Sequence, residues 1–166
     1  FLNPHDDVSL LRIANVPARG LSDVTMERML AASQERNCSV YAAMRHTDVQ
    51  ESCLSRTREC IIEFLHFIDE TRAPLSSGQP LSLKSWAEKF LDETGYLEEL
   101  KRQEKNAEIA ENRIRNVREL VEKLDENAAA ISDPMERLQT FLEEMTLDND
   151  REEDKEKKGE KKRQPI

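Results

Sequence analysis

The segment from Leu11 to Thr25, LRIANVPARGLSDVT, most narrowly constrains the fold of this chain. It predicts the end of one helix, a sharp turn and the start of another helix. Pro17 cannot continue a helix, and Gly20 can adopt backbone angles that are closed to other residues. Either Ser22 or Asp23 can cap the helix that follows. Such a hairpin points backbone N–H groups outward at a helix N-terminus, a geometry that suits a phosphate group.

The composition of the chain favours amphipathic helices over sheets. Hydrophobic residues make up 37% of the 166 residues and charged residues 36%, and only 4 residues are glycine. This profile is typical of helices with one solvated face, and a chain of this length can bury a real core. No apolar run reaches the length required to cross a bilayer. We therefore expect an all-α fold, with a single multi-helix domain over residues 1–147 and a charged tail over residues 148–166.

Apolar residues recur at helical spacing along most of the chain. The first helix is expected to run from Pro4 or His5 to about Ala14, with Val8 and Ile13 facing inward together with Leu11. The later helices share the same alternation of three and four residues between apolar positions. They are expected from about Ser22–Asp23, around residues 40–44, and over 52–72, 83–94, 107–126 and the segment that begins at Asp133.

Several expected helix ends carry capping residues. Gly95 stands where the C-cap of the preceding helix belongs. Asp133 is expected to cap the last helix, with Pro134 at its first position. Residues 73–80, APLSSGQP, contain two prolines and a glycine and predict a loop, which is expected to be mobile.

The negative charge of the chain is concentrated in residues 1–147. The formal net charge is −9, but residues 148–166 contain seven acidic and seven basic residues, so the rest of the chain carries all of it. A negative body repels nucleic acid at long range, so any DNA contact requires a local patch or backbone amides. The tail has no hydrophobic residue before Ile166, and its composition predicts disorder.

The sequence offers no catalytic, cofactor-binding or metal-binding set. The three cysteines and three histidines are not spaced as metal ligands, and the cysteines are expected to be buried, reduced thiols. The adjacent Glu98 and Glu99 do not converge on a helix, and no base accompanies them. The sequence also lacks the G-x-x-x-x-G-K-[ST] phosphate loop of ATPases. We therefore expect no site of any of these three kinds in this chain.

The hairpin segment resembles the opening of the 2B subdomain in the UvrD/Rep/PcrA helicases. The family pattern there is close to N-P-x-D-D … L-R-I-x-N-x-P-x-R-G-I-G-x-x-T. Leu21 and Ser22 stand where the family usually has Ile-Gly. The matching residues are Asn3, Pro4, Asp6, Asp7, Leu11, Arg12, Ile13, Asn15, Pro17, Arg19, Gly20 and Thr25.

Two later blocks are similar to the same subdomain, in the right order and at the right distances. Residues 138–150 resemble its exit helix, after which the family's chain re-enters the RecA-like 2A domain. The chain begins with Phe1 rather than Met, and the family's re-entry motif does not follow the charged stretch. We therefore expect a fragment that comprises the 2B insertion alone. The block at 90–120 matches the family pattern at Thr94, Gly95, Tyr96, Leu100, Arg113, Asn116, Val117, Glu119 and Leu120.

The resemblance implies that the parent enzyme is a bacterial, cytoplasmic, ATP-dependent 3′–5′ DNA helicase that acts in repair or replication restart. The other domains of that enzyme would bind ATP and Mg²⁺. In this reading the chain is its regulatory subdomain and modulates unwinding. Its expected partners are duplex DNA, the other helicase domains and repair or replication proteins. No membrane partner is expected. The alternative is a helical protein-interaction module that makes no direct contact with DNA.

The resemblance also implies which residues contact DNA. Backbone N–H groups near Gly20–Ser22 would bind the phosphates of a duplex, assisted by the Arg19 side chain and the Thr25 hydroxyl. The Cβ atom of Ser22 and the charge of Asp23 both oppose a close phosphate. Because the hairpin offers few charges and the body around it is acidic, we expect weak binding by the isolated chain. The expected DNA-binding residues are Arg19, Gly20, Leu21, Ser22 and Thr25.

Overall fold

Helices account for the regular structure of residues 1–126 and 130–146, the part of the chain that the computed structural model describes. No strand occurs in that part, which confirms the expected all-α fold. The predicted tail over residues 148–166 lies outside it. The elements are α1 (Asp7–Ile13), α2 (Asp23–Arg36), α3 (Val40–Met44), α4 (Thr47–Glu51), α5 (Ser55–Arg72), η1 (Ala73–Ser76), α6 (Leu83–Thr94), α7 (Tyr96–Gln103), α8 (Ala107–Lys123) and a helix over residues 134–146.

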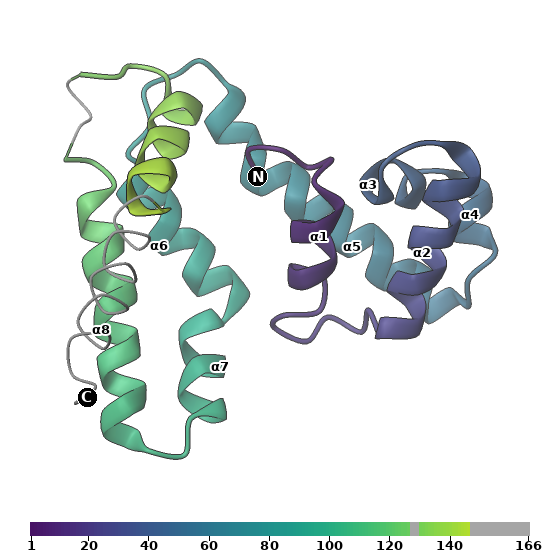
Figure 1. Ribbon diagram of the computed structural model, residues 1–166, viewed down its shortest axis with the longest axis horizontal. Coiled ribbons are helices and arrows are strands. Elements are labelled where there is room, and N and C mark those ends of the chain that lie inside the picture. Colours follow the sequence, from purple (N-terminus) through teal and green to yellow (C-terminus); the bar gives the residue numbers. More distant parts are fainter. Residues whose placement is uncertain (127–129, 147–166) are drawn as a thin grey trace, which may run out of the picture.

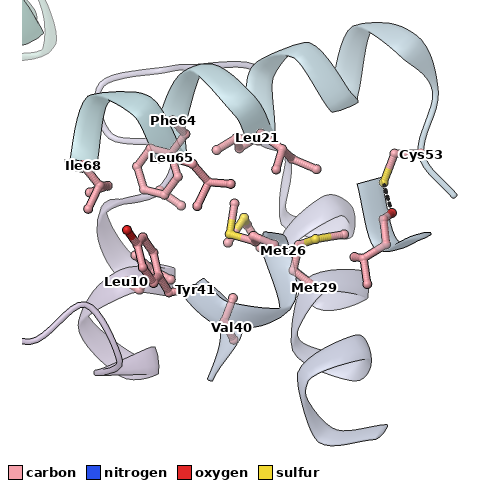
Figure 2. Close-up of a cluster of buried hydrophobic side chains, with 14 residues drawn as sticks. Leu10, Leu21, Met26, Met29, Val40, Tyr41, Cys53, Phe64, Leu65 and Ile68 are labelled. Atoms are coloured by element: carbon pink, nitrogen blue, oxygen red, sulfur yellow. Dashed lines mark hydrogen bonds between the residues drawn. The ribbon is translucent and has the colours of Figure 1, made fainter. Parts of the chain in front are cut away.

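The helices of this single domain gather in two groups (Figure 1). We call α1–α5 the N-terminal lobe, and α6–α8 with the 134–146 helix the C-terminal lobe. α5 supplies Ile61, Phe64 and Ile68 to the core of the N-terminal lobe, where side chains from the other helices of that lobe meet them (Figure 2). Phe1 packs against the cores of both lobes. The core of the C-terminal lobe contains Leu75, Leu83, Ala87, Val121, Leu124 and Leu138.

Three helix ends lie where the capping residues predicted them. Ser22, rather than Asp23, caps α2, because its side chain accepts the N–H of Thr25. Gly95 ends α6 in the left-handed conformation, with φ of 61°. Asp133 accepts the N–H of Glu136 at 3.2 Å and so caps the 134–146 helix. These contacts are local, which is why the sequence alone could predict them.

α1 is shorter than predicted, and two residues predicted to face inward do not. The helix begins at Asp7 rather than at Pro4 or His5, because the Asp6 side chain accepts the N–H of Ser9 at 3.1 Å and caps the first turn. Val8 is 71% exposed and Ile13 42% exposed. Leu10 and Ala14, four residues apart on one helical face, make the buried contact instead.

Three other element boundaries differ from the prediction, since α8 also ends at Lys123 rather than at residue 126. The predicted loop at 73–80 begins with η1, and Leu75 is completely buried in the core of the C-terminal lobe. α5 begins at Ser55 rather than at residue 52, which leaves Leu54 80% exposed at the helix start. The burial of Leu75 is decided by tertiary packing rather than by the local sequence.

Candidate nucleic-acid interface

Asn15 organises the turn between α1 and α2. Its side-chain oxygen accepts the backbone N–H of Arg19 at 2.8 Å and that of Leu21 at 3.2 Å. One carboxamide therefore closes the loop from both sides of Gly20. We call residues 14–25 the α1–α2 hairpin. The sequence motif contained Asn15, but its role in the turn was not among the predicted contacts.

Arg19 is built into the hairpin rather than free in solvent. Its Nη1 group donates hydrogen bonds to the backbone carbonyls of Ile13 at 3.1 Å, Val16 at 3.0 Å and Pro17 at 3.2 Å. Burial lowers the pKa of the Arg19 guanidinium, although arginine stays charged in proteins. The side chain therefore holds the end of α1 against the turn.

The same guanidinium lies over an aromatic platform on α5. Its central carbon is 5.8 Å from the ring centre of Phe64 and 5.2 Å from that of Phe67. Cations are attracted to the faces of aromatic rings at such distances. The three-residue spacing of the two phenylalanines places both rings on one face of α5. That spacing was visible in the sequence, but it does not reveal which cation the pair would meet.

Gly20 occupies a position that excludes a side chain for two reasons. Its φ is +75°, a left-handed conformation that L side chains rarely adopt. A Cβ atom added at this position would also lie 2.8 Å from the sulfur of Cys60 on α5. Cys60 and Cys38 are only half-buried, in contrast to the expectation for all three cysteines, whereas Cys53 is buried.

Two of the predicted DNA-binding side chains point into the protein. Leu21 is completely buried among the side chains of the N-terminal lobe (Figure 2), and Thr25 is 8% exposed. The Thr25 hydroxyl lies 3.0 Å from that of Ser22. Only Gly20 and Ser22 of the five predicted residues are exposed. Leu21 and Thr25 thus anchor the hairpin, and their side chains do not present a surface to a ligand.

The start of α2 presents backbone donors to solvent. Within the described part of the chain, the N–H groups of Ser22, Asp23 and Val24 have no acceptor, and all three residues are exposed. α2 has 14 residues, so its dipole adds a partial positive charge at this end. The carboxylate of Asp23 in the first turn opposes that charge. The arrangement can accept an anion such as a phosphate, with modest affinity.

No metal-binding or acid–base set accompanies this site in residues 1–126 and 130–146. Groups of three His, Cys, Asp or Glu side chains that could hold a metal ion do not occur there. Glu99 pairs with Arg102 at 2.9 Å, as an ordinary surface ion pair of α7, and no base approaches the Glu98–Glu99 pair. None of the described helices is long and apolar enough to span a bilayer.

Comparison with known proteins places the chain in a family. A probable DNA helicase II homolog from Rickettsia felis is 30% identical over 125 residues, which cover 75% of this chain and 18% of that relative. The homolog from Rickettsia conorii has the same identity and coverage. The ATP-dependent DNA helicase PcrA of Staphylococcus aureus is 28% identical over 119 residues, or 72% of this chain and 16% of the relative.

The chain thus spans less than a fifth of the length of these three relatives. The match to the family itself is nearly complete, because it covers residues 1–163. This chain belongs to the UvrD-like helicase C-terminal domain family.

Proposed function

We propose that this chain is the 2B subdomain of a UvrD/Rep/PcrA-type, ATP-dependent 3′–5′ DNA helicase, and that its α1–α2 hairpin binds the backbone of duplex DNA and modulates unwinding. The observation that carries the proposal is that the N–H groups of three exposed residues at the start of α2 have no acceptor within the described part of the chain. Asn15 and Arg19 hold these groups in place from inside the hairpin. Family membership supports the helicase context.

The contact is expected to be weak in the isolated chain. Few donors are available, Asp23 stands beside them, and the chain carries a net charge of −9. Non-specific DNA affinities are typically ~10⁻⁴–10⁻⁶ M at physiological salt, and this chain should lie at or beyond the weak end. In the parent enzyme the other domains hold the DNA, so that a weak local contact is enough to orient the duplex.

The parent enzyme supplies the chemistry in this proposal. ATP and Mg²⁺ bind to its other domains, because this sequence has no phosphate loop. The proposed partners of the chain are duplex DNA, those domains, and repair or replication proteins in the bacterial cytoplasm.

The N–H contact can be tested by a matched pair of substitutions at Asp23. Asp23→Ala removes the carboxylate but keeps the N–H, and should raise duplex affinity about two- to fivefold by removing a like charge. Asp23→Pro removes both, and proline is tolerated at the first helical position. Ser22 has φ of −65° and ψ of 161°, which a following proline allows.

The difference in duplex affinity between the two variants gives the contribution of the N–H group at residue 23. A typical hydrogen bond contributes about 0.5–1.5 kcal/mol on balance, so Asp23→Pro should bind duplex DNA about two- to tenfold more weakly than Asp23→Ala. Fluorescence anisotropy with a labelled duplex, with circular dichroism to verify folding, measures both. Equal affinities of the two variants would show that the N–H group does not bind phosphate.

A second candidate function is a helical protein-interaction module without direct DNA contact. Two observations favour it. The Leu21 side chain is buried, and the Nη1 group of Arg19 donates to three backbone carbonyls, so neither that side chain nor that Nη1 group is free for a phosphate. If neither Asp23 variant changes duplex affinity, this function takes precedence.

A further inference from the structure

A groove of about 540 Å³ lies between the two lobes, beside the α1–α2 hairpin. α1 and the hairpin form one wall, α6 and the start of α7 form the other, and α5 contributes aromatic rings. The volume falls within the roughly 300–1,000 Å³ that is typical of ligand pockets. Phe67, Phe90 and Tyr96 are among its lining residues. We call this feature the interlobe groove.

Acidic residues are missing from the interlobe groove. The chain contains 34 Asp and Glu residues among 166, yet none of them lines this groove. Three other surface hollows each include carboxylates, such as Glu122, Glu70 and Glu143. The interlobe groove has two arginines instead, Arg12 and Arg19. It is therefore an apolar surface with a local positive charge on a negative protein.

Both arginines lack a counterion in residues 1–126 and 130–146. Arg12 is exposed, and neither arginine forms an ion pair in that part of the chain. The bonds from Arg19 to backbone carbonyls all use Nη1, which leaves Nε and Nη2 without an acceptor there. These two groups form one side of the guanidinium fork, the side that a carboxylate binds with two parallel hydrogen bonds.

A half-buried cation beside aromatic rings has lost part of its hydration without gaining an opposite charge. Such a group is stabilised by any ligand that brings a carboxylate into the groove. The exposed rim offers apolar contact as well, because Ile13 is 42% exposed, Val16 53% and Tyr96 37%. A ligand that combines a carboxylate with bulky apolar groups would satisfy both features of the groove.

We propose that the interlobe groove binds a segment of a partner protein in which one carboxylate lies between bulky apolar side chains. The carboxylate pairs with the Nε and Nη2 groups of Arg19, with Arg12 adding charge at the rim. The apolar side chains pack against Phe67, Phe90 and Tyr96. This binding is separate from the proposed DNA contact at Asp23 and does not depend on it.

A peptide fits the interlobe groove better than a nucleic acid does. A nucleic-acid strand carries one phosphate per nucleotide and requires several cations along its path. Only Arg12 and Arg19 are basic among the lining residues, and the chain as a whole carries a charge of −9. A peptide with one carboxylate requires one guanidinium and an apolar surface, and the groove has both.

The test uses the 166-residue chain and a defined probe. The probe is a fluorescein-labelled peptide with the sequence Ser-Leu-Asp-Phe-Ser and an amidated C-terminus, and its control contains Asn in place of Asp. Anisotropy should give a dissociation constant on the order of 10⁻⁵–10⁻⁴ M for the Asp peptide, as expected for a short ligand in a largely preformed site. The Asn peptide should bind about tenfold more weakly, because the charge-assisted pair is lost.

Matched variants locate the binding site. Ile13→Ser should weaken binding of the Asp peptide about fivefold, whereas Ile62→Ser, at a residue of similar exposure (47%) outside the groove, should not change it. Arg12→Gln should weaken binding about threefold in low salt. Arg56→Gln removes an exposed arginine of α5 that does not line the groove, and should have no effect.

Four results would overturn the proposal: no binding of the Asp peptide, equal affinity for both peptides, equal effects of the groove and control variants, or displacement of the peptide by a dT12 oligonucleotide. The last result would assign the groove to nucleic acid. Duplex binding is measured in parallel for Ile13→Ser and the two Asp23 variants. This comparison separates the proposed DNA contact of the α1–α2 hairpin from the proposed peptide binding by the interlobe groove. Each can fail while the other stands.

Discussion

The contact between Gly20 and Cys60 predicts a measurable energetic coupling between the α1–α2 hairpin and α5. Gly20→Ala introduces two penalties. A left-handed backbone costs a residue with a Cβ about 1–2 kcal/mol. The new Cβ atom would lie 2.8 Å from the Cys60 sulfur, and overpacking of this kind typically costs about 1–3 kcal/mol. Gly20→Ala should therefore lower the free energy of unfolding by about 2–5 kcal/mol.

The two penalties can be separated by a second substitution. Cys60→Ala removes the sulfur, while its own Cβ atom lies 3.8 Å from the added one, an ordinary contact. In the Cys60→Ala background, Gly20→Ala should cost only the backbone strain. The double variant should thus be more stable than the sum of the single effects predicts, by about 1–3 kcal/mol. Urea unfolding of the four proteins completes this double-mutant cycle.

Gly95→Ala is the matched control for the strain alone. Gly95 has φ of +61°, and nothing lies within 4 Å of a Cβ atom added there. This variant should lose about 1–2 kcal/mol, and Cys60→Ala should not alter that loss. If the effects of Gly20→Ala and Cys60→Ala add to within about 0.5 kcal/mol, the close approach of the hairpin to α5 is not a steric constraint.

Two further predictions concern the core of the N-terminal lobe and the start of α6. Phe64→Ala should lower the free energy of unfolding by about 3–5 kcal/mol, whereas Ile62→Ala on the exposed face of α5 should change it by less than about 1 kcal/mol; equal shifts in the urea midpoint would contradict the helix faces described here. Burial alone would raise the pKa of Asp125, but hydrogen bonds from the Ser82 hydroxyl and two backbone N–H groups outweigh it and hold this pKa below its usual value. The stabilisation is therefore complete above the unfolded-state pKa of about 3.9 and is lost as the pH falls through the lower folded-state pKa. The free energies of unfolding of the native protein and of Asp125→Asn, measured from pH 2 to 6, should therefore differ near pH 6 and converge at acid pH.

The capping residues explain how much of the fold was predictable. Ser22, Gly95 and Asp133 act on atoms within four residues of themselves, so the sequence around each one determines its geometry. α1 was predicted less well, because its helical spacing alone does not say which face meets the rest of the lobe. The inward positions assigned to Val8 and Ile13 were wrong for that reason.

The candidate interface was predictable in position but not in the roles of its residues. The turn and the start of α2 lie where the motif predicts them. Arg19, however, meets Phe64 and Phe67, which are 45 or more residues away in the sequence, and no local pattern indicates that contact. Leu21 is apolar, and that property alone was a signal that its side chain belongs in the core rather than on a ligand-binding surface.

α5 connects the cores of the two lobes. α5 and η1 follow one another without a gap from Ser55 to Ser76, and α5 alone is about 27 Å long at 1.5 Å per residue. Phe64 near its middle lies under the hairpin, and Leu75 beyond its end is embedded in the other lobe. A substitution that displaces α5 should therefore disturb the packing of both cores, because one continuous helical segment contributes side chains to each of them.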